Sequence, residues 1–319
     1  MFNFIISKIK RYFLWFISKL DIKLFITIVS FFFIAFSIYR NFEGLSNLKI
    51  TIKEIIWFSV GILFSFLSII INAYAWKLLI NSIGLGGIKL KIIRIFINTN
   101  IYKYLPGGVW HFVSRYKTLK LTLSNEKSVE SILLEPLLML VAGLIYIPFG
   151  SYNIFIIIIC WSSPLVFVPG FRKFIIKTLK RMKASIFTSI DKDQSEKLVN
   201  NNKITYSKTY YPFMPLFIEV LFILFRFFGF LSCMSAFSIG SVISQRQLIS
   251  SFSLAWITGL VVPAAPGGLG VFESIILFSL GSQLPEAPLL ASLLCYRLVS
   301  TSSDILASLI YPIKRLLRV

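Results

Sequence analysis

The sequence predicts an all-α integral membrane protein with six transmembrane helices and two re-entrant helical hairpins arranged as an inverted repeat. Three observations lead to this fold class. The 319 residues have a mean hydropathy of +0.81 and only 14% are charged, which lies outside the range of soluble globular domains. The basic residues gather in a few connections between apolar runs. The tripeptide Pro-Gly-Gly occurs twice, each time within a hydrophobic stretch.

The six predicted spans are apolar runs long enough to cross a bilayer, which takes roughly 20 residues of helix. They lie at about 24–39, 55–80, 129–149, 153–170, 212–240 and 287–311.

The distribution of positive charge predicts the topology. Five segments carry 26 of the 33 Lys and Arg residues: 1–23, 77–94, 115–127, 171–210 and 312–319. The connections at 40–54, 150–152 and 241–246 hold four. Basic loops stay in the cytoplasm, so the first set and both termini are expected there. The net charge of +20 therefore indicates membrane topology and contact with anionic lipids, and no nucleic-acid partner is expected.

Two further apolar segments fit this topology only as hairpins. The first, about 94–114, begins and ends among cytoplasmic charges, and the second, about 247–284, begins and ends on the external side. Each contains one Pro-Gly-Gly, which breaks a helix because Pro lacks an amide donor and Gly disfavours helix. The alternative is a pair of kinked spans.

The chain is accordingly predicted to be one polytopic membrane domain, 1–319, built from two inverted halves. The halves are about 55–149 and 212–311, joined by a basic cytoplasmic linker at 171–210. Inverted repeats with interrupted helices are a recurring transporter plan that places the substrate near the bilayer midplane.

Charged residues inside apolar segments are the candidate binding groups, since each costs about 2.5–3.5 kcal/mol on insertion scales. Arginines suit an anionic head group, because guanidinium binds phosphate bidentately and keeps its charge. The carboxylates are expected to compensate the arginines, bind a cationic head group or take up a coupling proton. The alternative is that these charges pair with one another to fix helix register. The hairpin turns would add backbone N–H groups that favour an anion. The predicted substrate-binding residues are Arg115, Glu135, Arg226, Glu273, Arg297 and Asp304, with Pro106, Gly107, Gly108, Pro266, Gly267 and Gly268.

Five other polar residues have weaker signals. Glu219 lies near the cytoplasmic end of a span and is expected to be structural, and His111, the only histidine, is expected at the interface. Asn98, Asn100 and Tyr102 on the first hairpin would donate to a head group or satisfy freed carbonyls. The sequence has no Ser-His-Asp arrangement, phosphate loop or metal-ligand cluster, so no catalytic residue, metal or cofactor is assigned.

The two Pro-Gly-Gly regions also carry a family resemblance. The strings YLPGGVWHFVSRY (104–116) and VPAAPGGLGVFE (262–273) resemble the signature regions of the lysylphosphatidylglycerol synthase transmembrane, or flippase-like, family. The resemblance implies lipid translocation across a bacterial cytoplasmic (inner) membrane. The soluble synthase domain of the fused members is not expected here, and neither is lysine transfer.

The function expected from these observations is a flippase or transporter for an anionic-head-group lipid, such as an anionic phospholipid or a polyprenyl-phosphate-linked lipid. Two alternatives remain open. One is a membrane component of a lipid-linked glycosyl or aminoacyl transferase system, with Glu273 or Asp304 as base. The other is a scaffold that recruits a glycosyltransferase through the basic 171–210 loop.

Overall fold

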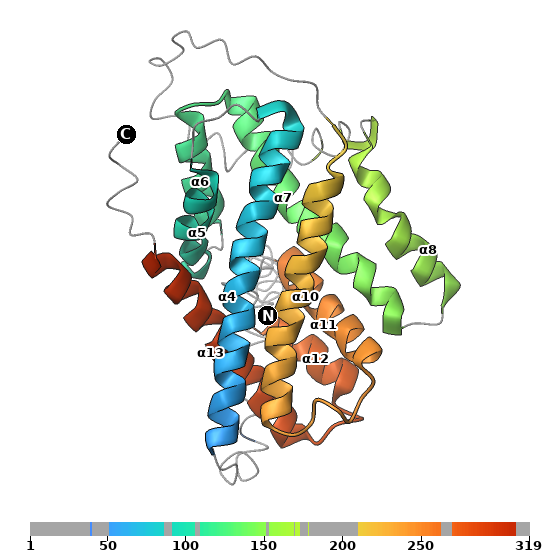
Figure 1. Cartoon of the computed structure of the whole chain (residues 1–319). Coiled ribbons are helices and arrows are strands. Elements are labelled where there is room, and N and C mark those ends of the chain that lie inside the picture. The colour runs from blue at the N-terminus through green and yellow to red at the C-terminus, as the bar shows by residue number, and fades with distance from the viewer. Residues whose placement is uncertain are drawn as a thin grey trace, which may run out of the picture.

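The computed structural model describes most of the chain between residues 51 and 310, and the described part is helical without strands (Figure 1). Both Pro-Gly-Gly tripeptides lie outside the described residues. So do most of the predicted span 24–39 and nearly all of the predicted linker 171–210. The described residues are 39, 51–85, 91–105, 109–150, 153–168, 170–172, 178, 210–262 and 270–310.

Four helices in the described residues are long and apolar enough to cross a membrane, which fits a multi-pass membrane protein. They confirm four of the predicted spans. The helices are α4 (Ile52–Ile80, continuing to Gly84), α7 (Asn125–Tyr146), α10 (Phe213–Ala236) and α13 (Glu286–Ile310).

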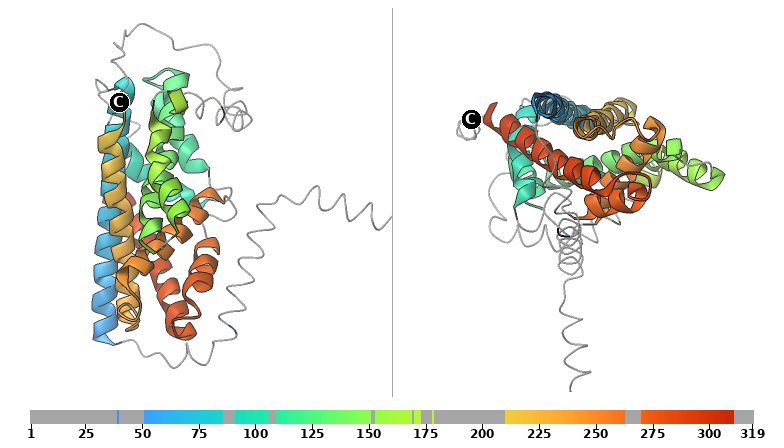
Figure 2. Two further views of the ribbon diagram at one scale, coloured as in Figure 1. Left: turned by 90° about the vertical axis from the view of Figure 1, so that its right-hand side faces the viewer. Right: turned by 90° about the horizontal axis from the view of Figure 1, so that it is seen from below.

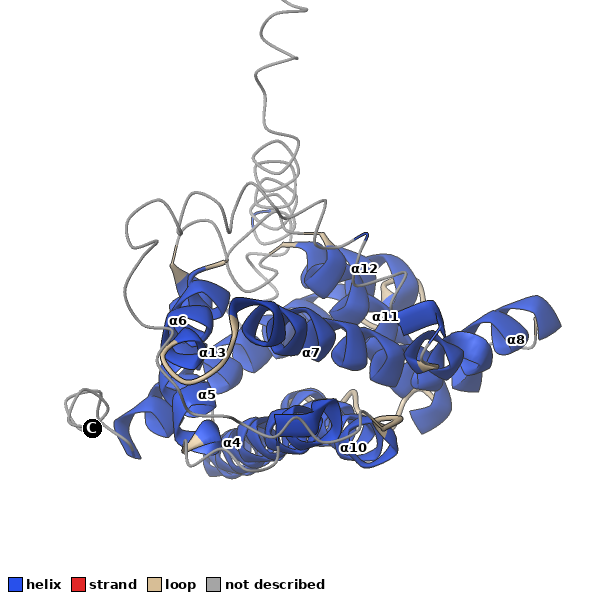
Figure 3. Ribbon diagram, turned by 90° about the horizontal axis from the view of Figure 1, so that it is seen from above, coloured by secondary structure: helices blue, strands red, loops and turns tan. Residues whose placement is uncertain are grey.

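The predicted span at 153–170 is shorter than expected. It consists of α8 (Ile154–Ser162) and a 3-10 turn, η4 (Ser163–Phe167). Pro164 stands at the start of the 3-10 turn, where its missing amide N–H ends the α-helical hydrogen-bond pattern. This apolar helix is peripheral (Figure 3) and is not among the four that could cross a membrane.

The bundle has two layers, one of which is the antiparallel pair of α4 and α10 (Figures 1 and 3). Small residues let these two backbones approach closely, as is usual between membrane helices. A Cβ placed on Gly229 would lie only 2.5 Å from Ser65 Oγ and 3.4 Å from the Gly61 carbonyl. Phe64 packs against Phe228 beside this contact, with ring centroids 5.3 Å apart.

The second layer holds α7, α13 and two pairs of short helices (Figure 2). The first pair is α5 (Ile92–Asn100), extended by the 3-10 turn η2 (Ile101–Tyr104), and α6 (Trp110–Lys120). It lies toward the end of the molecule where α4 finishes. The second pair, α11 (Gln245–Val261) and α12 (Val271–Leu280), lies toward the opposite end, where α10 finishes.

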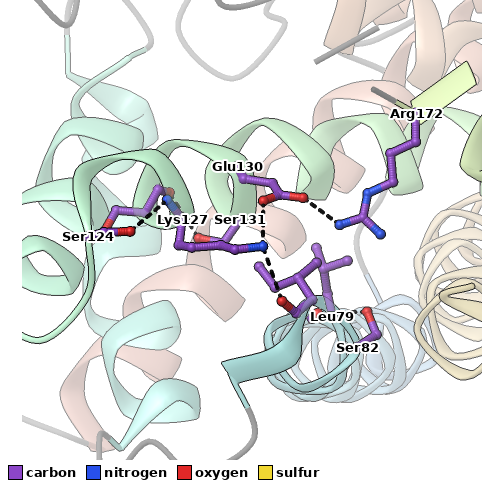
Figure 4. A network of polar contacts seen from close by, with 9 residues as sticks. Leu79, Ser82, Ser124, Lys127, Glu130, Ser131 and Arg172 are labelled. Atoms are coloured by element: carbon purple, nitrogen blue, oxygen red, sulfur yellow. Dashed lines mark hydrogen bonds and ion pairs between the residues drawn. The ribbon is translucent and has the colours of Figure 1, made fainter. Parts of the chain in front are cut away.

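One end of the molecule brings together parts of the basic connections (Figure 4). Lys127 donates to the Ile83 carbonyl at 3.4 Å and pairs with Glu130 at 3.1 Å. Arg172 pairs with the same Glu130. The Tyr210 N–H donates to the Ser82 carbonyl at 3.0 Å. The C-terminal end of α4, the N-terminal end of α7 and the two ends of the 171–210 segment therefore lie at the same end of the molecule.

The opposite end has hydrogen bonds between elements that are distant in the sequence. Lys53 at the start of α4 donates to Ser238 Oγ after α10, at 3.2 Å. Ser250 of α11 donates to the Ile147 carbonyl after α7, at 2.6 Å. Of these residues, Lys53 belongs to the 40–54 connection that the sequence predicts on the external side.

A buried aromatic cluster fixes the elements of the second half relative to one another. Phe230, Phe252, Phe272 and Tyr296 come from α10, α11, α12 and α13, with ring centroids 5.4–6.0 Å apart. All four are buried. Because Glu273 and Arg297 adjoin two of these rings in sequence, the cluster positions both charged side chains.

Candidate substrate site: a buried charge network

Asp304 on α13 is the centre of a polar network inside the bundle. Its carboxylate accepts hydrogen bonds from Tyr104 Oη at 2.6 Å and Asn100 Nδ2 at 2.7 Å. Lys103 Nζ forms an ion pair with it at 2.7 Å. These three partners lie at the end of α5 and in the η2 turn that follows it. The first predicted hairpin segment therefore contacts α13, the last predicted span.

Arg226 connects the same carboxylate to α10. Its guanidinium lies 3.6 Å from Asp304 and donates to Ser300 Oγ at 2.8 Å, one turn before Asp304 on α13. Both Arg226 and Asp304 are buried. One carboxylate therefore holds two cations from elements far apart in sequence, which neutralises charges that are costly inside apolar surroundings.

Arg115 and Glu135 form a second, fully enclosed ion pair between α6 and α7. The Arg115 Nε also donates to Thr99 Oγ1 at 3.0 Å. Its guanidinium lies over the Phe96 ring at 3.8 Å and near Trp76 at 5.2 Å. With the Arg115 side chain only 1% exposed, this group binds α5, α6 and α7 together.

Glu273 and Arg297 form the third ion pair, between α12 and α13. Two guanidinium nitrogens contact the carboxylate, one of them at 3.1 Å. Glu273 also accepts the Gly270 N–H at 2.8 Å, which caps the start of α12. Gly270 has a φ of 89°, a left-handed conformation that favours glycine. Arg297 lies 5.3 Å from the Phe272 ring.

All six charged residues predicted from the sequence belong to these three groups, and each arginine has a carboxylate partner. The pairs join different elements of the bundle: α6 with α7, α10 with α13, and α12 with α13. The remaining predicted site residues, the two Pro-Gly-Gly tripeptides, lie outside the described residues.

Exposure separates the cations into two classes. The side chains of Arg115 and Arg226 are 1% and 7% exposed, whereas those of Lys103 and Arg297 are 23% and 22% exposed. The first two are enclosed by protein. The side chains of Lys103 and Arg297 remain partly exposed.

Sequence reasoning missed Lys103 and Tyr104. A signal was present, because a lysine inside a predicted re-entrant hairpin costs as much as the charges that were selected within spans. Of the residues with weaker signals, Asn100 joins the network through Asp304. Asn98 is buried, and its amide group has no hydrogen-bond partner among the described residues. His111 is half-buried with its ring 3.8 Å from that of Phe112.

The described residues contain no group of three or more His, Cys, Asp or Glu side chains that could hold a metal ion. In comparisons with known proteins, no family model matches the chain and no curated protein matches it.

Proposed function

We propose that this protein is a flippase-like transporter that moves an anionic-head-group lipid across a bacterial cytoplasmic membrane. The observation that carries the proposal is the Asp304 network, in which Lys103, Arg226 and a carboxylate meet inside a bundle of apolar helices. Ionisable groups at membrane depth are costly and mark substrate or ion pathways. The resemblance of 104–116 and 262–273 to the flippase-like family supports the same substrate class.

The charges suit a phosphate-bearing head group. The side chains of Lys103 and Arg297 are partly exposed, and ammonium and guanidinium groups form charge-assisted hydrogen bonds with phosphate oxygens. An arriving phosphate competes with Asp304 for Lys103 and with Glu273 for Arg297. The carboxylates therefore neutralise the empty site and yield the cations to a lipid whose acyl chains stay in the bilayer.

We also propose the finer architecture of six spans and two inverted halves. Supporting it, α4 and α10 run antiparallel and the short helix pairs lie toward opposite ends. The ion pairs support it as well. In the first half Arg115 on α6 pairs with Glu135 on α7, and in the second Glu273 on α12 pairs with Arg297 on α13. Each half thus has an arginine–glutamate pair between its second short helix and its last long helix. The arginine is on the short helix in the first half and on the long helix in the second.

In this proposal the end where Lys127, Arg172 and Tyr210 meet faces the cytoplasm, and both termini lie there. Rocking of the halves about the α4–α10 pair would expose the site to alternate sides of the membrane. The lipid is an anionic phospholipid or a polyprenyl-phosphate-linked lipid.

A vesicle assay tests this function. The full chain is reconstituted with fluorescent phosphatidylglycerol or a fluorescent polyprenyl phosphate, and an impermeant quencher reports how much label reaches the outer leaflet. Lys103→Ala and Arg297→Ala should each lower the rate about tenfold or more, since a hydrogen bond to a charged group contributes about 1.5–3 kcal/mol. Lys77→Ala is the matched control, because Lys77 is exposed and its ammonium group lies over the Tyr74 ring on its own helix.

Two results would overturn the proposal. One is that the wild-type protein moves neither lipid faster than protein-free vesicles. The other is that Lys103→Ala and Arg297→Ala transport at the rate of Lys77→Ala. Formation of a glycosylated or aminoacylated lipid by the purified protein would instead establish the transferase alternative.

A further inference from the structure

Glu219 is a buried carboxylate that the three ion pairs do not use. It lies on α10 with 1% of its surface exposed, and its Oε2 has no hydrogen-bond partner among the described residues. A buried ionised carboxylate without a partner is very costly, and such a group usually becomes neutral by taking up a proton.

The charged groups within electrostatic range of Glu219 are Glu135 on α7 and Arg115 on α6. Tyr146 of α7 is the other titratable neighbour, and its hydroxyl donates to the Val220 carbonyl at 3.0 Å. On α10 itself the nearest charge is Arg226, two turns away. In the described part of the chain, the charged residues that α13 brings into the bundle are held in the other two ion pairs, Asp304 with Arg226 and Arg297 with Glu273.

The α4–α10 register gives the level of a buried uncharged polar residue on α4. Phe64 of α4 packs against Phe228 of α10, and the two helices are antiparallel. Continuing this register by about two turns places Asn72 at the level of Glu219. Asn72 is buried, and its Oδ1 has no hydrogen-bond partner within the described residues. An amide oxygen of this kind accepts a hydrogen bond from a protonated carboxyl group and repels an ionised one.

The local charge count leaves one negative charge in excess. Arg115 already pairs with Glu135, donates to Thr99 and lies over Phe96, so its single positive charge is balanced. If Glu219 were ionised as well, two carboxylates would share one guanidinium in a buried site. Closely spaced carboxylates of this kind bind a proton as a pair.

We propose that Arg115, Glu135 and Glu219 form a proton-binding site that holds one proton, carried by Glu219 while Glu135 is paired with Arg115. Only an O–H bond forms or breaks, and the proton is exchanged with water at the membrane surface. If Arg115 turns from Glu135 to Glu219, the proton moves to Glu135. Use of this exchange to drive transport rests on the proposed function, whereas proton binding itself does not.

Infrared spectroscopy of the full-length protein in a detergent that contains no carbonyl group, such as an alkyl maltoside, tests the site directly. A protonated carboxyl group gives a carbonyl-stretch band that an ionised one lacks, and we expect this band at neutral pH. Glu219→Gln should remove it. Glu130→Gln is the matched control and should leave it unchanged, because Glu130 is on α7 but pairs with Lys127 and Arg172 outside this site.

Two further variants separate proton sharing from simple burial. Glu135→Gln releases Arg115 to pair with Glu219, so the band should disappear although Glu219 is still present. Arg115→Gln leaves two carboxylates without a cation, so the band should grow about twofold as both become protonated. The size-exclusion profile of each variant establishes that it is folded.

The proposal is overturned if the wild-type protein shows no such band at neutral pH, or if the band persists in Glu219→Gln. It is also overturned if the band is unchanged in both Glu135→Gln and Arg115→Gln. Because the measurement needs no lipid transport, its failure and the failure of the flippase assay are distinguishable.

Discussion

Lys103 Nζ lies 2.7 Å from the Asp304 carboxylate, although the two residues are far apart in the sequence. The contact attaches the η2 turn, in the first predicted hairpin segment, to α13. Tyr104 and Asn100 strengthen the attachment, and Arg226 brings in α10. A single carboxylate thus holds three elements of the bundle together.

Asp304→Asn should destabilise the protein strongly. The isosteric amide removes the negative charge that Lys103 and Arg226 share, which leaves a buried arginine without a counter-ion. Breaking a buried ion pair from one side costs about 3–5 kcal/mol. Thermal unfolding in detergent should show a large fall in Tm. Glu286→Gln on the same helix should show little change, and equal midpoints for the two variants would contradict the assigned role.

The two functions of Glu273 can be separated by substitution. Glu273→Gln removes the ion pair with Arg297 but keeps a side-chain oxygen for the Gly270 N–H, whereas Glu273→Ala removes both. Losing a helix N-terminal cap costs about 1 kcal/mol. We therefore expect the alanine variant to unfold with a free energy about 1 kcal/mol lower than the glutamine variant. Equal chemical denaturation curves would show that the cap contributes nothing.

Cys233 on α10 and Cys295 on α13 should form a disulfide under a membrane-permeable oxidant. Their Sγ atoms are 3.3 Å apart and both residues are buried free thiols. Bond formation requires an S–S distance of about 2.0 Å, which a small side-chain movement supplies. Loss of thiol labelling after denaturation measures the reaction. Cys160→Ser should leave the loss of two thiols intact and Cys233→Ser should abolish it. Unchanged labelling in the wild type would contradict the α10–α13 contact.

The close approach of α4 and α10 should not tolerate a larger side chain at Gly229. A Cβ there meets Ser65 Oγ at 2.5 Å, so Gly229→Val must separate the helices or displace Ser65. Overpacking of this kind costs about 1–3 kcal/mol. Unfolding in detergent should show the loss, while Gly170→Val should not, because nothing lies within 4 Å of its Cβ position. Similar losses in the two variants would point to backbone effects instead.

The long spans could be predicted from the sequence because length and hydropathy alone specify them. The runs 55–80 and 212–240 became α4 and α10 within a few residues of their predicted bounds. The run 153–170 gave a shorter helix, since Pro164 removes a backbone donor that hydropathy does not register.

The individual partners within the site could not be predicted in the same way. Glu219 and Arg226 share one face of α10, yet Arg226 pairs with Asp304 on α13, whereas Glu219 takes part in none of the three ion pairs. Spacing along one helix reports which residues share a face, but it carries no information about the helix opposite. The cost of a lysine within a predicted hairpin could have indicated Lys103, but its partner Asp304 is fixed only by tertiary packing.

The anchoring of the 171–210 segment has a consequence for how the chain is assembled. Arg172 is held to Glu130 and Tyr210 to Ser82, so both ends of the segment are fastened to the same end of α4 and α7. The α4–α10 contact, the Asp304 network and the α7–α11 packing all hold without using the covalent connection. Two fragments cut between these anchors and made together should therefore reassemble by complementation, as two separately encoded chains would.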